Sequence, residues 1–188
     1  MSSNLEFKAT PIAGLFIIER KVITDERGYF FRLFCKDELS EIGLNKSLAQ
    51  INYSHANKKF TVRGFHFQDL PDCETKIVTC IKGEVFDIAL DLRAGSSTFL
   101  KWFGTILSEK NNRSMFIPEG FAHATQTLTD KSSLIYMHSE AYSPLTEGGI
   151  NINDPVISVK WPAKPLNLSK RDASFPYLSS TFQGIIIK

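Results

Sequence analysis

Turn-forming residues divide this chain of 188 residues into short segments of similar length, and this spacing constrains the fold more than any other feature. Clusters of Gly, Asn, Asp, Ser and Lys lie at 25–28, 56–59, 82–83, 94–97, 110–113 and 129–131. The segments between them are rich in β-branched and aromatic residues, which favour strands. About ten short strands, with turns roughly every eight to twelve residues and almost no helix, are typical of a sandwich or jelly-roll. We therefore expect an all-β fold.

Alternation within the segments supports this prediction. Val85, Asp87 and Ala89 fall on one face of a strand over 84–93, because successive side chains point to opposite faces. Further strands are expected at 14–20, 29–34, 47–54, 98–107, 121–129, 134–142 and 157–161. The one plausible helix is short, at 36–43. The sequence contains no recognisable repeat or linker, so we expect residues 1–188 to form a single domain.

Composition excludes several classes of function. The 22 Lys and Arg residues and 20 Asp and Glu residues leave a net charge of +2, and no basic stripe is present to bind nucleic acid. The three cysteines lack a Cys-x-x-Cys spacing, which fits a reducing compartment and argues against a disulfide framework. Neither a signal-like N-terminus nor an apolar run long enough for a membrane span is present. We expect a cytoplasmic protein without a nucleic-acid or membrane partner.

The clearest cluster of unusual polar residues begins at Arg63. His66 follows between two phenylalanines, where a lone histidine is more often a core residue than a catalyst. Arg63 and Lys76 change this balance, because two cations near an imidazole suit a site that binds an anion. The alternative for Lys76 is an exposed strand-edge lysine that limits aggregation.

Other candidates need partners from elsewhere in the chain. Asp87 lies on a largely apolar strand face, and a buried carboxylate requires a partner such as a histidine. His123 is one candidate, and alone it would be a partly buried strand histidine. Asp172 is a second acid that could pair with a histidine, and its alternative is a solvated loop residue. Tyr136 and Tyr142 would share one face of the expected strand 134–142, because six residues is an even spacing.

Metal and other common chemistries are disfavoured. The chain has four histidines and lacks the pair one residue apart that jelly-roll metal sites often use. It also lacks a Gly-x-Ser-x-Gly elbow, a P-loop and a dinucleotide fingerprint. We expect no metal and no cofactor.

Six blocks of the sequence form a recognisable set: Arg63–Gln68, Gly83–Asp87, Ile117–His123, Asn153–Pro155, Trp161-Pro162 and Leu168–Asp172. Together they resemble the dTDP-4-dehydrorhamnose 3,5-epimerase family. They occur in the family's order and extend the resemblance from about Gly14 to Asp172. The resemblance implies a cupin-type jelly-roll, or double-stranded β-helix. It also implies a cofactor-independent epimerase for a nucleotide-linked 4-keto-6-deoxy sugar, inverting C3, C5 or both in surface-polysaccharide or deoxysugar biosynthesis.

The resemblance also implies a role for each matching residue. His66 matches the general base beside the 4-keto group, Asp172 the acid that orients it, and Tyr136 the group that returns a proton from the opposite face. The expected substrate-binding residues are Arg27, Gln50, Asn52, Arg63, Lys76, His123, Tyr142 and Glu147. Within this set, Lys76 matches the cation near the enolate oxygen and Tyr142 the ring that stacks on the base.

The family is dimeric and exchanges N-terminal strands, which correspond here to residues of about 10–34. Arg27 would then serve the neighbouring subunit's site. The chain departs from the family pattern at Arg32, where a base-contacting Glu is usual, and at Ala124-Thr125, where Gly-Phe is usual. These departures point to a different base or sugar.

Two alternatives use the same scaffold. One is a 3,4-ketoisomerase that moves the carbonyl, and the other is a non-catalytic cupin that binds sugar nucleotides. The joint presence of His66, Lys76, Tyr136 and Asp172 favours an enzyme, because binding alone has little need of acid and base together. A metal-dependent cupin is a third, weaker alternative.

Overall fold

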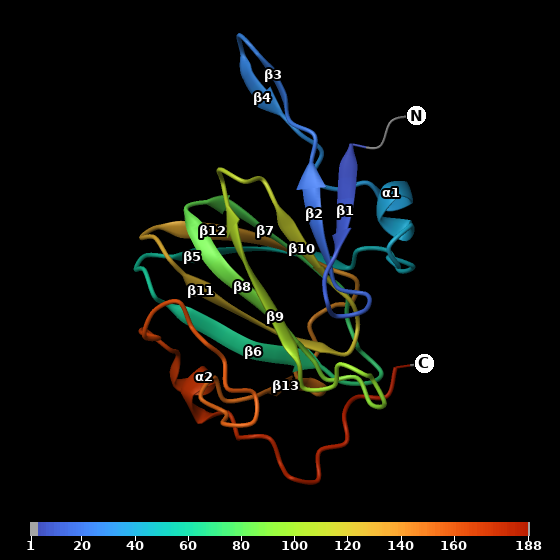
Figure 1. Cartoon of the computed structure of the whole chain (residues 1–188), viewed down its shortest axis with the longest axis vertical. Coiled ribbons are helices and arrows are strands. Elements are labelled where there is room, and N and C mark those ends of the chain that lie inside the picture. The colour runs from blue at the N-terminus through green and yellow to red at the C-terminus, as the bar shows by residue number, and fades with distance from the viewer. Residues whose placement is uncertain (1–3, 188) are drawn as a thin grey trace.

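The computed structural model describes residues 4–187, which form thirteen strands and two short helices. Most of the strands belong to two antiparallel sheets that face each other, and a separate hairpin projects from the body (Figure 1). The predicted all-β jelly-roll fold is confirmed. None of the helices within residues 4–187 is long and apolar enough to span a membrane.

The larger sheet has six strands. In spatial order they are β1 (Leu5–Ala9), β2 (Phe16–Arg20), β10 (Ser114–Ile117), β7 (Lys76–Lys82), β12 (Ser132–His138) and β5 (Gln50–Ala56). The smaller sheet has five. Its order is β13 (Glu147–Gly149), β6 (Val62–Gln68), β11 (Phe121–Thr127), β8 (Glu84–Asp91) and β9 (Trp102–Ser108).

Apolar side chains fill much of the space between the sheets. Val78 and Leu134 from the larger sheet pack with Val85 and Ala89 from the smaller one. Burying such side chains contributes roughly 1.5–3 kcal/mol each, which holds the sheets together. Strand alternation then directs the polar residues of the same inward faces into the gap beyond this core.

The outer faces of both sheets are also covered. Helix α1 (Lys36–Ser40) contributes the buried Leu39 to the cluster behind the larger sheet. The C-terminal segment, which includes α2 (Lys170–Ser174), packs Trp161 and Leu168 behind the smaller sheet. Burial on both faces explains why several strands read as continuous apolar runs.

The hairpin consists of β3 (Ile23–Asp25) and β4 (Gly28–Phe30), and it projects beyond the end of the sheets (Figure 1). Tyr29 and Phe30 are each 68% exposed there. The expected strand 29–34 is therefore only partly confirmed. The predicted helix is confirmed, although it is shorter than expected.

Two other expectations about strands were wrong. The strand expected at 134–142 ends at His138, because its antiparallel neighbours β5 and β7 begin at the paired residues Gln50 and Lys76. Tyr136 and Tyr142 therefore do not share a strand. Residues 157–161 form no strand, since Ser158 has a positive φ of 48° and the neighbouring apolar side chains pack on the smaller sheet instead. Strand β1 lies in a segment for which no strand was expected.

Candidate active site

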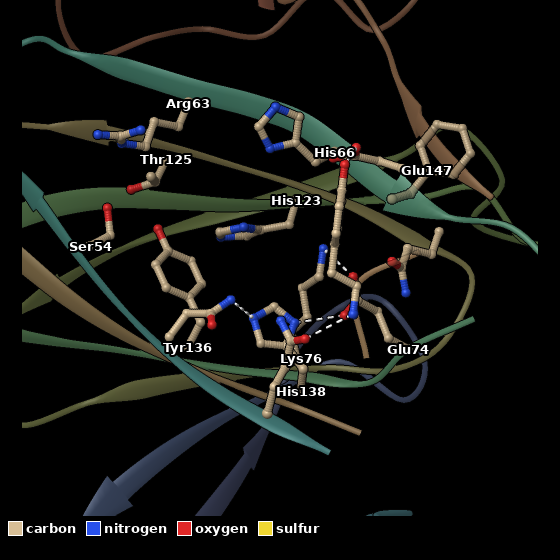
Figure 2. A pocket seen from close by; sticks show the side chains of 15 residues that line it. Ser54, Arg63, His66, Glu74, Lys76, His123, Thr125, Tyr136, His138 and Glu147 are labelled. Carbon is tan, nitrogen blue, oxygen red and sulfur yellow. Dashed lines mark hydrogen bonds and ion pairs between the residues drawn. The ribbon is translucent and has the colours of Figure 1, made fainter. Parts of the chain in front are cut away.

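A cavity of about 300 Å³ lies between the two sheets, at the point where polar inward-facing residues replace the apolar core. Figure 2 shows His66 and His123 on one wall and Tyr136, Lys76 and His138 on the other. The first wall belongs to β6 and β11 and the second to β7 and β12. The complete lining is Gln50, Asn52, Ser54, Arg63, His66, Phe67, Gln68, Glu74, Lys76, His123, Thr125, Tyr136, His138, Tyr142 and Glu147.

His66 is paired with Asp172, which comes from a distant part of the chain. His66 Nε2 lies 2.9 Å from Asp172 Oδ1, and the Gly64 N–H donates to Asp172 Oδ2 at 3.4 Å. Asp172 is held in the first turn of α2, where its own N–H donates to the Ser169 side chain at 2.9 Å. The predicted contact is confirmed, and the alternative of a solvated loop residue is wrong because Asp172 is 4% exposed.

A second imidazole–carboxylate pair lies on the same wall. His123 Nε2 is 2.7 Å from Asp87 Oδ1, as expected from the sequence. Asp87 is completely buried, and within residues 4–187 its Oδ2 atom has no hydrogen-bond partner. Residues His123 and His66 are cross-strand neighbours, so the two imidazoles present acid–base groups side by side.

Tyr136 occupies the opposite wall. Its ring lies edge-on to that of His123, with the centroids 5.8 Å apart, and its hydroxyl points toward the end of the cavity near Thr125 and Ser54 (Figure 2). Burial and the charge of Asp87 raise the pKa of Tyr136, so the phenol keeps its proton at neutral pH. The Thr125 hydroxyl is buried and has no hydrogen-bond partner within residues 4–187.

A third pair was missed by the sequence analysis. His138 Nδ1 lies 2.6 Å from Glu74 Oε2, and Glu74 Oε1 lies 2.9 Å from Lys76 Nζ. Burial would raise the pKa of Glu74, but the hydrogen bond from His138 and the charge of Lys76 outweigh it, and the pKa lies below its ordinary value. The available signal was the alternation of β12, which puts His138 on the same face as Tyr136. Lys76 is therefore buried in the cavity, and the alternative of an exposed edge lysine is wrong.

Three of the residues expected to contact a nucleotide, Gln50, Tyr142 and Glu147, are joined by hydrogen bonds at one end of the cavity. The Tyr142 hydroxyl donates to Glu147 Oε2 at 2.7 Å, and the Tyr142 N–H donates to Gln50 Oε1 at 2.8 Å. Tyr142 is 54% exposed, which leaves a face of its ring free. Arg63 lies at the other end of the lining, with its guanidinium 3.4 Å from the carbonyl oxygen of His55.

Two arginines singled out from the sequence lie outside the cavity lining. The Arg27 side chain is 84% exposed in the β3–β4 hairpin and pairs with Asp25 at 2.5 Å. Arg32 forms an ion pair with Glu38 of α1. The geometry therefore separates both residues from the site in their own protomer.

Within residues 4–187, no group of three or more His, Cys, Asp and Glu side chains is arranged to hold a metal ion. Each imidazole in the cavity instead pairs with one carboxylate. Such pairs orient an imidazole for proton transfer.

Comparison with known proteins agrees with this geometry. The family model described as dTDP-4-dehydrorhamnose 3,5-epimerase matches residues 9–180. The dTDP-4-dehydrorhamnose 3,5-epimerase of Salmonella typhimurium is 43% identical over 171 residues, which cover 90% of this chain and 93% of the relative. The dTDP-4-dehydrorhamnose 3-epimerase of Streptomyces niveus is 38% identical over 86% of this chain and 78% of its own length.

Solved structures show the same relationship. The crystal structure of the dTDP-6-deoxy-D-glucose-3,5-epimerase of Legionella pneumophila, in complex with dTDP-4-keto-L-rhamnose, matches with a TM-score of 0.91 and 34% identity. That match covers 98% of this chain and 99% of the other. The family match covers the smaller sheet, the larger sheet except for most of β1, and every residue that lines the cavity. The chain belongs to the dTDP-4-dehydrorhamnose 3,5-epimerase family.

Proposed function

We propose that this protein is an epimerase that acts on a nucleotide-linked 4-keto-6-deoxy sugar and inverts C3, C5 or both. The observation that carries the proposal is the placement of His66 and Tyr136 on opposite walls of one cavity. Inversion of a carbon requires removal of a proton from one face and its return to the other. The 4-keto group makes the neighbouring C–H bonds weakly acidic, so no cofactor is needed.

His66 is the proposed base, and Asp172 orients it. Burial alone would raise the pKa of Asp172, but hydrogen bonds and the charge of His66 lower it below the ordinary value. The carboxylate is therefore ionised at neutral pH and stabilises the imidazolium that forms when His66 takes a proton. Tyr136 then donates a proton from the opposite wall. Lys76 stabilises the negative charge on the enolate oxygen, and His123, braced by Asp87, binds the sugar.

Gln50, Asn52, Arg63, Tyr142 and Glu147 are the proposed contacts for the nucleotide and its diphosphate. Tyr142 would stack on the base with its exposed face. The names of the relatives point to thymidine nucleotides, although Arg32 replaces the usual base-contacting Glu. We place the enzyme in the cytoplasm, where nucleotide sugars for surface polysaccharides are made, and we propose that it works as a homodimer.

Incubation with dTDP-4-keto-6-deoxyglucose in deuterated water tests the proposal. We expect deuterium at C3, C5 or both, observed by NMR, together with inverted product. His66→Ala should abolish exchange at both carbons, and Tyr136→Phe should impair product formation more than exchange. His55→Ala is the matched control, because His55 lies on the exposed face of β5 and not in the cavity lining.

Two results would contradict the proposal. Absence of exchange with dTDP-, UDP-, CDP- and GDP-linked 4-keto-6-deoxy sugars would remove the epimerase activity. A product with the carbonyl moved to C3 would identify a ketoisomerase instead.

A further inference from the structure

His138 has no role in the mechanism above, although it lines the same cavity. It lies two residues after Tyr136 on β12, so both side chains face the cavity from the wall opposite His66 (Figure 2). Their rings are 6.2 Å apart between centroids and nearly parallel, with an interplanar angle of 24°. This wall therefore carries two groups able to donate a proton.

The contacts of His138 fix how its ring can act. Nδ1 is held by Glu74 at 2.6 Å, which leaves Nε2 as the nitrogen available to the cavity. Asn52 Nδ2 lies 3.4 Å from Nε2, and a proton on Nε2 requires the Asn52 amide to be turned so that its oxygen accepts. A carboxylate on one nitrogen fixes the orientation of an imidazole and stabilises its protonated form.

The charged neighbourhood of His138 is closely packed. Lys76 on β7 and Glu74 just before that strand are each 9% exposed at the side chain, and Lys76 is the direct cross-strand neighbour of His138. The titratable and charged groups that face this pair across the cavity are His66, His123, Arg63 and Glu147. Glu74 contacts both Lys76 and His138, so a proton on His138 leaves this wall with one net positive charge instead of two.

We propose that His138, held by Glu74, is a second catalytic proton donor, so that Tyr136 and His138 each serve one of the two carbons that flank the ketone. The inference rests on the proposed epimerase function and concerns the same site. The rings of Tyr136 and His138 lie on the same wall, opposite His66, so each can deliver a proton to the face of the sugar that the base does not serve.

The proton balance is simple. His66 takes a proton from the ring carbon, and the electrons of that C–H bond form the enolate. The electron pair then forms a new C–H bond on the other face with the proton that leaves His138 Nε2. His66 ends protonated and His138 neutral, and each returns to its starting state by exchanging a proton with water.

The test follows C3 and C5 separately by NMR, with dTDP-4-keto-6-deoxyglucose in deuterated water. We expect His138→Asn to retain exchange at both carbons, because His66 still acts as the base. Inversion at one carbon should fall about 100-fold or more, the usual contribution of a general acid. Tyr136→Phe should affect the other carbon. His55→Asn is the matched control for loss of an imidazole outside the cavity.

A second variant separates the acid role from packing. Glu74→Gln keeps the shape of the side chain but removes the charge that stabilises a protonated His138. It should reduce inversion at the same carbon and leave exchange at that carbon intact. Thermal melting and dTDP binding show whether each variant is folded.

The possible outcomes distinguish the two proposals. Wild-type inversion of both carbons by His138→Asn would overturn the role of His138 and leave the epimerase proposal intact. Equal loss of exchange and inversion at both carbons in that variant would also overturn it, because a lost acid spares exchange. If the wild-type enzyme inverts only one carbon, there is no second inversion for His138 to serve, and its proposed role is overturned. Absence of exchange in the wild type would overturn both proposals.

Discussion

Asp172 combines almost complete burial with a negative charge. Loss of hydration would raise the pKa of its carboxyl group, but the hydrogen bond and charge of His66 and the Gly64 N–H lower the pKa below the ordinary value. The ionised form is therefore the more stable one in the folded protein, and its stability is tied to the orientation of His66.

Asp172→Asn should uncouple this pair. We expect kcat for the epimerisation to fall about 100- to 10,000-fold, with little change in dTDP affinity, because the imidazole loses the charge that supports it. Breaking a hydrogen bond to a buried charge should also cost about 1.5–3 kcal/mol of unfolding free energy. An unchanged kcat in steady-state assays would contradict the dyad.

The pH dependence of stability follows from the same shift. A carboxyl with a lowered pKa in the folded state stabilises the fold above its unfolded pKa of about 3.9 and loses that contribution as pH falls through the lower folded value. Chemical denaturation should therefore show a difference in unfolding free energy between wild type and Asp172→Asn. This difference should be constant at about pH 6–7 and should shrink below about pH 4.

The sequence predicted some of the imidazole–carboxylate pairs and not others. Asp87 and His123 could be matched because each lies on an inward face of a recognisable strand. Glu74 and His138 are 64 positions apart, and Glu74 precedes its strand, so no local pattern connects them. The pairing depends on the register between β7 and β12, which the sequence alone does not specify.

Strand β6 is positioned by a close approach to β11. Gly64 has a φ of 120°, and a Cβ atom there would lie 2.5 Å from the Ala124 Cβ and 2.5 Å from the His123 carbonyl oxygen. The pairing of the two strands shifts register between His123 and Thr125, beside this contact. Glycine therefore allows the backbone turn that directs both Arg63 and His66 toward the cavity.

Gly64→Ala should force the two strands apart. We expect a loss of at least about 1–3 kcal/mol of unfolding free energy, from the strained φ and the overpacking together, and a large loss of epimerase activity as His66 moves. Gly43→Ala is the matched control, because Gly43 also has a positive φ of 102° but no atom within 4 Å of the added Cβ. Equal melting temperatures for the two variants would contradict the close-approach argument.

Local sequence predicted the strands better than their ends. Alternation and turn residues depend on a few neighbouring positions, and they located the segments that became β5, β8 and β11. The end of β12 depends instead on where its antiparallel neighbours β5 and β7 begin, because a strand continues only while it has partners. For the same reason, an apolar run such as 157–161 packs against a sheet without joining it.

For the whole molecule, the β3–β4 hairpin is the main element that the body of its own protomer leaves uncovered (Figure 1). An isolated two-stranded hairpin is marginally stable in water, and this one exposes Ile23, Tyr29 and Phe30. Both facts support the proposed dimer in which the N-terminal strands pack on the neighbouring subunit. Arg27 at the hairpin tip would then reach the partner's cavity and bind the diphosphate.

Hybrid dimers test this arrangement directly. Arg27→Ala should lower kcat/KM about 10- to 100-fold through the lost charged contact, and His66→Ala should remove activity. If Arg27 serves the neighbouring site, a dimer of one Arg27→Ala and one His66→Ala subunit has one complete site. That site combines His66 of the first subunit with Arg27 of the second.

Random pairing in an equal co-expression would make about half of the dimers hybrid, and each hybrid has one intact site of two. We therefore expect about a quarter of the wild-type activity at substrate concentrations well below KM, measured against the two variants mixed without subunit exchange. If Arg27 instead served its own protomer, each site of the hybrid would lack one of the two residues. Activity would then stay at the average of the two separate variants, and the strand-exchanged dimer would be contradicted even if sedimentation showed two subunits.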